Sequence, residues 1–264
     1  GQNASNAPHG YSSGGSKLAL TYMLSFDNKD LRRDLTCEMF RYENSGMTNI
    51  VQKPIAALTV YCGKWNRLFM ATPLGSTSNK GTGINYTYMR YADILLMYAE
   101  AANENHNGPT PQAKEALKKV RNRAFAAEDQ PEMVDAYVDK LTSKEDFFDA
   151  IVKERACEFG GEKHRRYDLA RWNLYGKTLY NLYFDWITLG KVARTKQYEN
   201  TTTAFEEPTY DERFESYPAV AYYKMVDAVN PAAVCVSQTI DWYKEGGKNS
   251  YDEAFESYPS KAPT

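Results

Sequence analysis

Apolar and polar residues recur with the period of an amphipathic helix over one long stretch of the chain, from Arg90 to Trp172. It reads RYADILLMYAEAANE, then PQAKEALKKVRNRA, then SKEDFFDAIVKERACEFGGEKHRRYDLARW, with short links rich in Gly, Pro and Asn. Apolar positions three and four residues apart form one face of a helix. The pattern therefore predicts three or four helices in this stretch, flanked by less regular, loop-rich segments.

The first two predicted helices form a hairpin. One runs from about Tyr88 to Asn105, and Pro111 suits the first turn of the next. Their predicted apolar faces are Tyr91, Ile94, Leu95, Tyr98 and Ala102, and then Ala113, Ala116, Leu117, Val120 and Ala124. Two helices within about 35 residues, with small Ala residues at the contact, are typical of one tetratricopeptide-type hairpin. Such hairpins usually stack in threes or more, so we expect this chain to dock against further hairpins or to have lost them.

The third predicted helix begins at Ser143, which has Asp146 three residues later in a variant of the capping box. Gly160 and Gly161 end this helix. A fourth helix carries Tyr167, Leu169, Ala170, Trp172 and Leu174. Between the hairpin and the third helix, residues 125–142 are expected to form an acidic connector.

The remaining segments give weaker signals. Residues 18–26 suit a short helix or a short strand, and the alternation in 27–42 predicts a strand edge. Charges at 30–34 are expected to be solvated or paired locally. The segment YDERFESYP (210–218) recurs as YDEAFESYP (251–259), with eight of nine positions identical. We assign this repeat no function.

Composition narrows the class of protein. Apolar residues make up 42% of the chain, enough for a core, and the 32 basic residues are interleaved with 34 acidic ones, which does not suit a nucleic-acid partner. No apolar run approaches the roughly 20 residues of a membrane span, and no signal peptide is visible. Four cysteines, Cys37, Cys62, Cys157 and Cys235, lie too far apart in sequence for a CxxC motif. Free thiols are the simpler interpretation, and disulfides the alternative.

The densest charges lie in the third and fourth predicted helices. We interpret six of them as a structural ion-pair network: Glu154, Arg155, Glu158, Arg165, Asp168 and Arg171. A hydrolase would need two facing carboxylates about 5 to 9.5 Å apart without arginine partners. Nearby arginines depress carboxyl pKa values, which is the wrong direction for a general acid. The three histidines lack zinc-site spacing, so we expect no catalytic residues, metal or cofactor.

Three of these motifs, RYADILLMYAEAANE, KKVRNRA and IVKERACEFGGEKHRRYDLARW, occur in the order seen in the SusD/RagB family, and the chain resembles the C-terminal core of those proteins. The upstream DLRRDLTCEMF and GKWNRLF are similar to the family's middle region. The resemblance implies a mainly α fold of tetratricopeptide-like helical hairpins with long loops and a few short strands. It implies one domain over 1–264, with its core at 84–175 and the N-terminal helical-repeat part absent from this chain.

The resemblance also implies a function. Such proteins are non-enzymatic outer-membrane surface lipoproteins that capture oligosaccharides, or peptides in some branches, for a TonB-dependent transporter barrel. Membrane attachment would come only through a lipid anchor not present in this chain. Only Asn230-Pro231 is similar to the family's usual ending.

Ligand contacts vary within the family, so candidates come from the residues themselves. We expect aromatic rings and polar groups in the loops before the helical core to bind the ligand: Tyr11, Tyr61 and Trp65, with His9 and Asn6. Rigid rings with an apolar face and a polar edge suit sugar surfaces. Core packing or disorder remains an alternative for each residue, and a peptide-binding lid or a general helical-repeat interaction module remains an alternative function.

Overall fold

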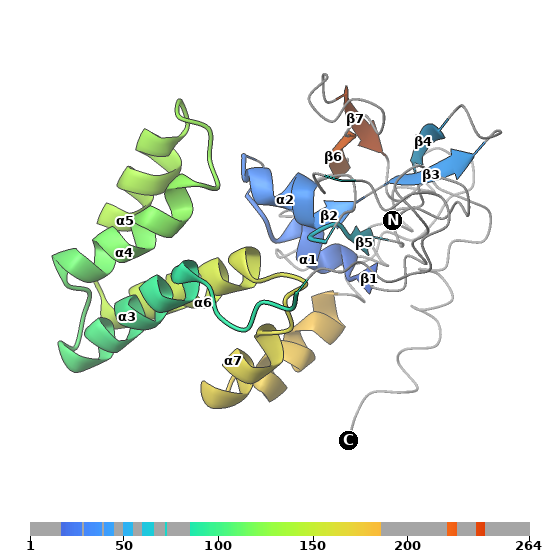
Figure 1. Ribbon diagram of the computed structural model, residues 1–264. Coiled ribbons are helices and arrows are strands. Elements are labelled where there is room, and N and C mark those ends of the chain that lie inside the picture. The colour runs from blue at the N-terminus through green and yellow to red at the C-terminus, as the bar shows by residue number, and fades with distance from the viewer. Residues whose placement is uncertain are drawn as a thin grey trace, which may run out of the picture. The chain divides into compact units, whose positions relative to one another are not determined.

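The computed structural model describes residues 17–27, 29–38, 40–44, 50–54, 60–65, 72, 85–185, 221–225 and 236–240. Over this part of the chain the fold is mainly helical with a few short strands, as the sequence predicts (Figure 1). The chain divides into two compact units. The helical unit comprises 26–36 and 82–168, and the mixed unit comprises 1–25, 37–81 and 169–264. Assignment of 1–264 to a single domain stays a prediction, because compactness alone does not decide whether the units fold separately.

The helical unit is built around a helical hairpin and a third long helix. The hairpin is α3 (Tyr91–Asn105) and α4 (Pro111–Asn122), and α6 (Lys144–Glu158) packs against α3. In Figure 1 these helices lie side by side, with α5 (Tyr137–Asp139) beside α4. The unit also contains α2 (Leu31–Thr36) and the first residues of α7 (Arg165–Arg171).

Local sequence sets the helix ends. The Thr110 hydroxyl accepts a hydrogen bond from the Ala113 N–H at 3.1 Å, and the Ser143 hydroxyl accepts one from the Asp146 N–H at 3.0 Å. Each such cap contributes about 1 kcal/mol. Asn107, with φ 51°, and Gly108, with φ 154°, turn the chain between α3 and α4. The predicted start of the third helix at Ser143 is therefore confirmed.

A single apolar core joins α3, α4, α5 and α6. Its fully buried members are Ala92, Leu96, Ala99, Ala113, Ala116, Leu117, Val120, Val138, Phe147, Ala150, Ile151 and Phe159. Four of these on the α3–α4 hairpin are alanines, which let the two backbones approach closely. The predicted apolar face of α4 is confirmed, since all five of its residues are buried.

The predicted apolar face of α3 is only partly correct: Leu95 and Ala102 are partly buried and pack against the core, but the other three residues do not belong to it. Tyr91, Ile94 and Tyr98 are 72%, 43% and 49% exposed, while Leu96 is fully buried. Apolar residues occupy two sides of this helix, so their periodicity does not select one face. The buried side also carries Asp93 and Asn103, which disguised it in the sequence. Both polar groups have partners: Asp93 binds Arg155, and the Asn103 amide donates to the Lys144 carbonyl at 2.9 Å.

Three further expectations need correction. Part of the acidic connector is helical, because η2 (Pro131–Ala136) and α5 bury Val134 and Val138, four residues apart. The strand edge predicted within 27–42 begins only at Cys37, because residues 31–36 form α2. Arg32 on α2 makes long-range ion pairs rather than only local ones.

The mixed unit contains short strands. β1 (Lys17–Leu18), β5 (Val60–Cys62) and β2 (Cys37–Glu38) form an antiparallel sheet in the order β1-β5-β2, and α1 (Leu20–Leu24) follows β1. Two antiparallel pairs are formed by β3 (Phe40–Asn44) with β4 (Ile50–Pro54), and by β6 (Ala221–Met225) with β7 (Val236–Ile240). A further helix spans 175–185. The repeat at 210–218 and 251–259, and Asn230-Pro231, lie outside the described residues.

Candidate functional site

The predicted ligand-binding residues fall into two groups. Asn6, His9 and Tyr11 lie outside the described residues. Tyr61 is half-buried in β5, opposite Lys17 of β1 and Glu38 of β2. Trp65 lies in the turn after β5 and is 37% exposed. An exposed indole on a turn can stack on a ligand, whereas Tyr61 is a strand residue between two neighbours, so the ligand-binding role stays a prediction for all five.

Sequence reasoning missed an exposed aromatic surface on the helical unit. We call it the α3 edge; it comprises Tyr88, Tyr91, Ile94, Met97 and Tyr98, which are 83%, 72%, 43%, 37% and 49% exposed. The signal was present, since Tyr91, Ile94 and Tyr98 recur at helical spacing, but these three were interpreted as part of a core face. An exposed apolar stripe of this kind marks a surface for binding a protein or another ligand.

One polar contact supports the chain just before the α3 edge. The Tyr86 hydroxyl donates to the Glu162 carbonyl at 3.1 Å, and the Tyr86 and Tyr88 rings meet edge to face at 5.1 Å. Lys163 Nζ lies 6.0 Å from the centroid of the Tyr86 ring. These contacts hold the segment leading into α3 against the loop that follows α6.

The buried charges converge on α6. Glu154, 1% exposed, accepts from Arg121 Nη1 on α4 at 2.7 Å and from Arg32 Nη1 on α2 at 2.7 Å. Arg121 also donates to the Met133 carbonyl at 2.8 Å, and its guanidinium lies 4.0 Å from the Tyr137 ring centroid. Glu154 thus joins three segments that are far apart in the sequence.

Glu158, one turn further along α6, receives three arginines. Arg32 Nη1 donates at 3.1 Å, Arg90 Nη1 at 2.8 Å and Arg123 Nη2 at 2.9 Å. Arg90 also makes two hydrogen bonds to the Glu162 carboxylate, at 2.9 and 2.8 Å. Burial by itself raises the pKa of Glu158, but the Arg90 hydrogen bonds and the charges of Arg32 and Arg123 outweigh it, so its pKa lies below the ordinary value.

Among the six residues predicted to form an ion-pair network, Arg155 Nε donates to Asp168 at 2.8 Å. Arg155 Nη1 also donates to Asp93 at 2.6 Å. Arg165 Nη1 donates to the Val152 carbonyl at 2.9 Å, and the Arg171 guanidinium lies 4.3 Å from the Trp172 ring centroid.

The other partners of the predicted network, Arg32, Arg90, Arg121 and Arg123, were missed. They come from distant segments, up to 126 residues away from Glu158. Spacing along a helix cannot reveal such partners. That the network locks the helices together stays a prediction.

These carboxylates are poorly suited to acid–base chemistry. A general acid near neutral pH needs a raised pKa, and the arginines around Glu158 act in the opposite direction. Cys157 is buried on α6, and burial raises the pKa of its thiol to about 12, so it is a poor nucleophile. Within the described ranges, no group of three or more His, Cys, Asp or Glu side chains is arranged to hold a metal ion.

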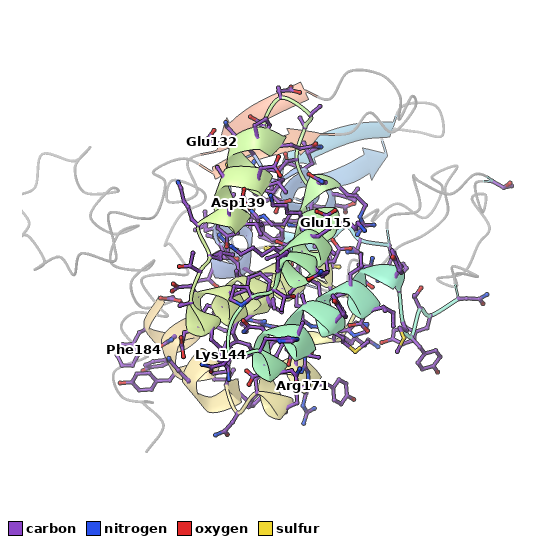
Figure 2. All side chains as sticks on the ribbon, turned by 90° about the vertical axis from the view of Figure 1, so that its left-hand side faces the viewer. Glu115, Glu132, Asp139, Lys144, Arg171 and Phe184 are labelled. Carbon is purple, nitrogen blue, oxygen red and sulfur yellow. The ribbon has the colours of Figure 1, made fainter. Side chains whose placement is uncertain are left out.

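A shallow, charged depression lies beside the hairpin. Its volume is about 330 Å³, and it is lined by Pro109, Pro111, Lys114, Glu115, Lys118 and Asp139. Figure 2 shows Glu115 and Asp139 on the neighbouring helices α4 and α5. Lys118 is paired with Asp135 and Asp139, both at 3.0 Å, so its charge is already answered within the protein. Attracting an anionic ligand with Lys118 would therefore mean breaking these ion pairs.

Comparison with known proteins identifies the class. The described residues form a hairpin-based helical fold with a buried arginine–carboxylate network and exposed aromatic rings. The sequence profile of the SusD family matches residues 25–240, and the chain belongs to this family.

Relatives and a solved structure agree with this assignment. The chain is 43% identical over 90 residues to SusD-like protein P25 of Formosa agariphila, and 27% identical over 176 residues to SusD-like protein P2 of the same organism. These matches cover 34% and 64% of the chain. The crystal structure of a SusD homolog from Bacteroides thetaiotaomicron matches with a TM-score of 0.55 and 28% identity over 64% of the chain.

The matched part of each relative is short. It amounts to 16% and 34% of the two Formosa proteins and 35% of the crystallised homolog. The chain therefore spans about a third or less of the length of these proteins. Within the described residues, no helix is long and apolar enough to cross a membrane.

Proposed function

We propose that this protein is a non-enzymatic binding protein of the outer-membrane surface that captures oligosaccharides and delivers them to a TonB-dependent transporter barrel. Membership of the SusD family over residues 25–240 carries this proposal. Membrane attachment would be through a lipid anchor. No cofactor enters the proposal, since binding and release of a sugar need none.

The charge arrangement supports a binding role over a hydrolytic one. Glu154 and Glu158 are each bound by two or more arginines at 2.7 to 3.1 Å. A glycosidase acid must stay protonated until it donates, which these contacts oppose. Incubating the protein with a bound oligosaccharide and analysing the products by mass spectrometry tests this directly: release of shorter sugars, absent in a heat-inactivated sample, would contradict the non-enzymatic role.

Trp65 is the best candidate contact among the described residues, with Tyr11, Tyr61, His9 and Asn6 as further candidates. Its ring is 37% exposed on a turn, where one face can meet a sugar ring. Aromatic contacts of this kind contribute about 0.5–1.5 kcal/mol, so replacing Trp65 by Ala should weaken binding roughly 2- to 12-fold.

The test is calorimetric titration with a panel of neutral and acidic oligosaccharides. Trp65→Ala and Tyr11→Ala are compared with Tyr167→Ala, which removes a ring that is 74% exposed on α7. We expect weaker binding for the first two variants and unchanged binding for the third. If both loop variants bind a verified sugar as tightly as the parent, the site assignment is wrong. If no sugar in the panel binds, the choice of ligand class is wrong.

Delivery to a transporter has its own test. We expect the protein to co-purify with a large β-barrel from native outer membranes after mild detergent extraction. A monodisperse protein recovered without a barrel at the same ionic strength would contradict the partnership.

The α3 edge favours one alternative, a peptide-binding lid or a general helical-repeat interaction module. Its apolar side chains Ile94 and Met97 lie among exposed tyrosines, a mixture that suits a protein surface. If the parent protein binds peptides from a library and the Ile94→Ser variant does not, the result supports this alternative. If both proteins bind the same peptides, the α3 edge is not the peptide-binding surface.

A further inference from the structure

Two cysteines that are 25 positions apart in the sequence are brought opposite each other in the β1-β5-β2 sheet. Cys37 of β2 pairs with Cys62 of β5, and the neighbouring pair is Glu38 with Tyr61. Directly opposed residues of antiparallel strands project their side chains from the same face of the sheet. Both thiols are therefore on one side, next to each other across the strand pair.

The spacing of such a pair is close to that of a disulfide. Opposed residues in antiparallel strands have Cα atoms about 4.5 or 5.5 Å apart, and a disulfide needs about 4.4–6.8 Å. The Cβ atoms, about 4.5–5.5 Å apart in a pair, must come within about 3.5–4.5 Å. A movement of up to about 1 Å is thus sufficient. β2 has two residues and lies at the edge of the sheet, so it can shift without disrupting a second strand pair.

We propose that Cys37 and Cys62 form a redox site, in which an intramolecular disulfide between β2 and β5 closes when the folded protein meets a small-molecule or protein disulfide. Neither cysteine is part of a disulfide in this structure. Cys62 is partly exposed and Cys37 is 3% exposed. The oxidant therefore reaches Cys62 first, and Cys37 resolves the mixed disulfide from the buried side.

The two steps are thiol–disulfide exchanges, with oxidised glutathione as the example. The Cys62 thiolate attacks one glutathione sulfur, forming a mixed disulfide and releasing one glutathione thiolate. The Cys37 thiolate then attacks the Cys62 sulfur, forming the Cys37–Cys62 bond and releasing the second glutathione. The protein loses two electrons and two protons in total, and oxidised glutathione gains them as two thiols.

Other thiols do not compete equally. Cys157 is buried in the helical unit, and its raised pKa of about 12 leaves almost no thiolate at neutral pH. Burial also raises the pKa of Cys62, so exchange is expected to be slow at pH 7 and faster near pH 8.5. Cys235 lies outside the described residues and is removed in the test by Cys235→Ser.

The experiment measures the effective concentration of the Cys37 thiol relative to the Cys62 thiol, which is how strongly the fold favours a disulfide between them over mixed disulfides with glutathione. Cys235→Ser protein is equilibrated with mixtures of reduced and oxidised glutathione at pH 8.5, in buffer and in 8 M urea. The reaction is quenched with acid, and the disulfides are mapped by non-reducing mass spectrometry. Cys37→Ser and Cys62→Ser variants serve as controls that cannot form the Cys37–Cys62 bond.

We expect the Cys37–Cys62 peptide to be the main cross-link in buffer. Its effective concentration should exceed that in urea by roughly 30- to 1,000-fold, the factor that matches the usual stabilisation by a disulfide through a thermodynamic cycle. A ratio within about threefold of one would overturn the proposal, because the fold would then not favour the pair. A Cys37–Cys157 or Cys62–Cys157 cross-link as the main product would overturn it as well.

Discussion

Replacing Glu154 by Gln removes the charge at the centre of the buried network while keeping the size of the side chain. The carboxylate is 1% exposed and binds Arg32 and Arg121 at 2.7 Å each. Arg32 keeps Asp30, at 3.0 and 2.7 Å, and Glu158. Arg121 is 2% exposed, and it keeps its hydrogen bond to the Met133 carbonyl, its contact with the Tyr137 ring and a distant ion pair with Asp27 at 3.7 Å. The variant therefore leaves a buried guanidinium without a close carboxylate.

Breaking a buried ion pair by removing one partner costs about 3–5 kcal/mol. Gln retains one acceptor, so we expect Glu154→Gln to lower the free energy of unfolding by about 3 kcal/mol. The assay is urea unfolding followed by far-ultraviolet circular dichroism with linear extrapolation. Asp135→Asn is the matched control, since it neutralises an exposed carboxylate in the Lys118 pair and should change stability by at most about 0.5 kcal/mol.

A double variant separates the orphaned charge from other effects. If unpaired Arg121 is the cause, Glu154→Gln combined with Arg121→Met should be less destabilised than the sum of the two single variants, by about 1 kcal/mol or more. A loss of less than about 1 kcal/mol in Glu154→Gln, or strict additivity in the double variant, would refute the view that this network locks the helices together.

Two further predictions use other parts of the helical unit. Leu96→Ala should lower the free energy of unfolding by about 2–5 kcal/mol, because Leu96 is fully buried. Ile94→Ala should change it by about 0.5 kcal/mol or less, because Ile94 is 43% exposed. Equal losses in urea unfolding would mean that Ile94 belongs to the buried face of α3 after all. The pKa of Glu158 is lower in the folded protein than its ordinary value of 4.5, so its stabilisation is present above about pH 4.5 and is lost as the pH falls through the folded pKa. Stability measured from pH 7 to pH 3 should therefore fall less steeply for Glu158→Gln than for the parent, and parallel curves would contradict the assigned direction.

Local signals in the sequence were sufficient for the helix ends and for α4. Ser143 and Pro111 act on neighbouring backbone groups, so their effect is visible from sequence alone. The apolar residues of α4 lie along one side of the helix and polar residues occupy the others, so only one side can be the buried face.

For α3 the same reasoning failed, because the helix has apolar residues on two sides. Packing decided between them: alanines such as Ala92 and Ala99 allow close approach to α4 and α6, whereas Tyr91 and Tyr98 are too large for that contact. The buried Asp93 made the true face look polar, and its partner Arg155 lies 62 residues away. Choosing the right face required knowing that distant partner.

The candidate site was harder to predict than the fold for a related reason. Ion pairs such as Arg32 with Glu154, 122 residues apart, have no periodicity and no spacing rule. Aromatic residues are equally common in cores and on binding surfaces, so exposure separates the two uses. Trp65 and Tyr98 are both aromatic and both exposed, and the structure is needed to place one on a turn and the other on a helix face.

The buried network also limits where a ligand can bind on the helical unit. Arg32 on α2, Arg90 before α3, Arg121 on α4 and Arg123 after α4 all meet carboxylates of α6. A ligand that took Arg32 or Arg121 would break a buried ion pair with Glu154, at a cost of about 3–5 kcal/mol, which exceeds the gain from a typical hydrogen bond. Exposed rings carry no such cost, because they are already in water and lose only apolar surface on binding. Ligand binding on this unit should therefore use surfaces such as the α3 edge, while the charges that dominate its sequence hold the helices in place.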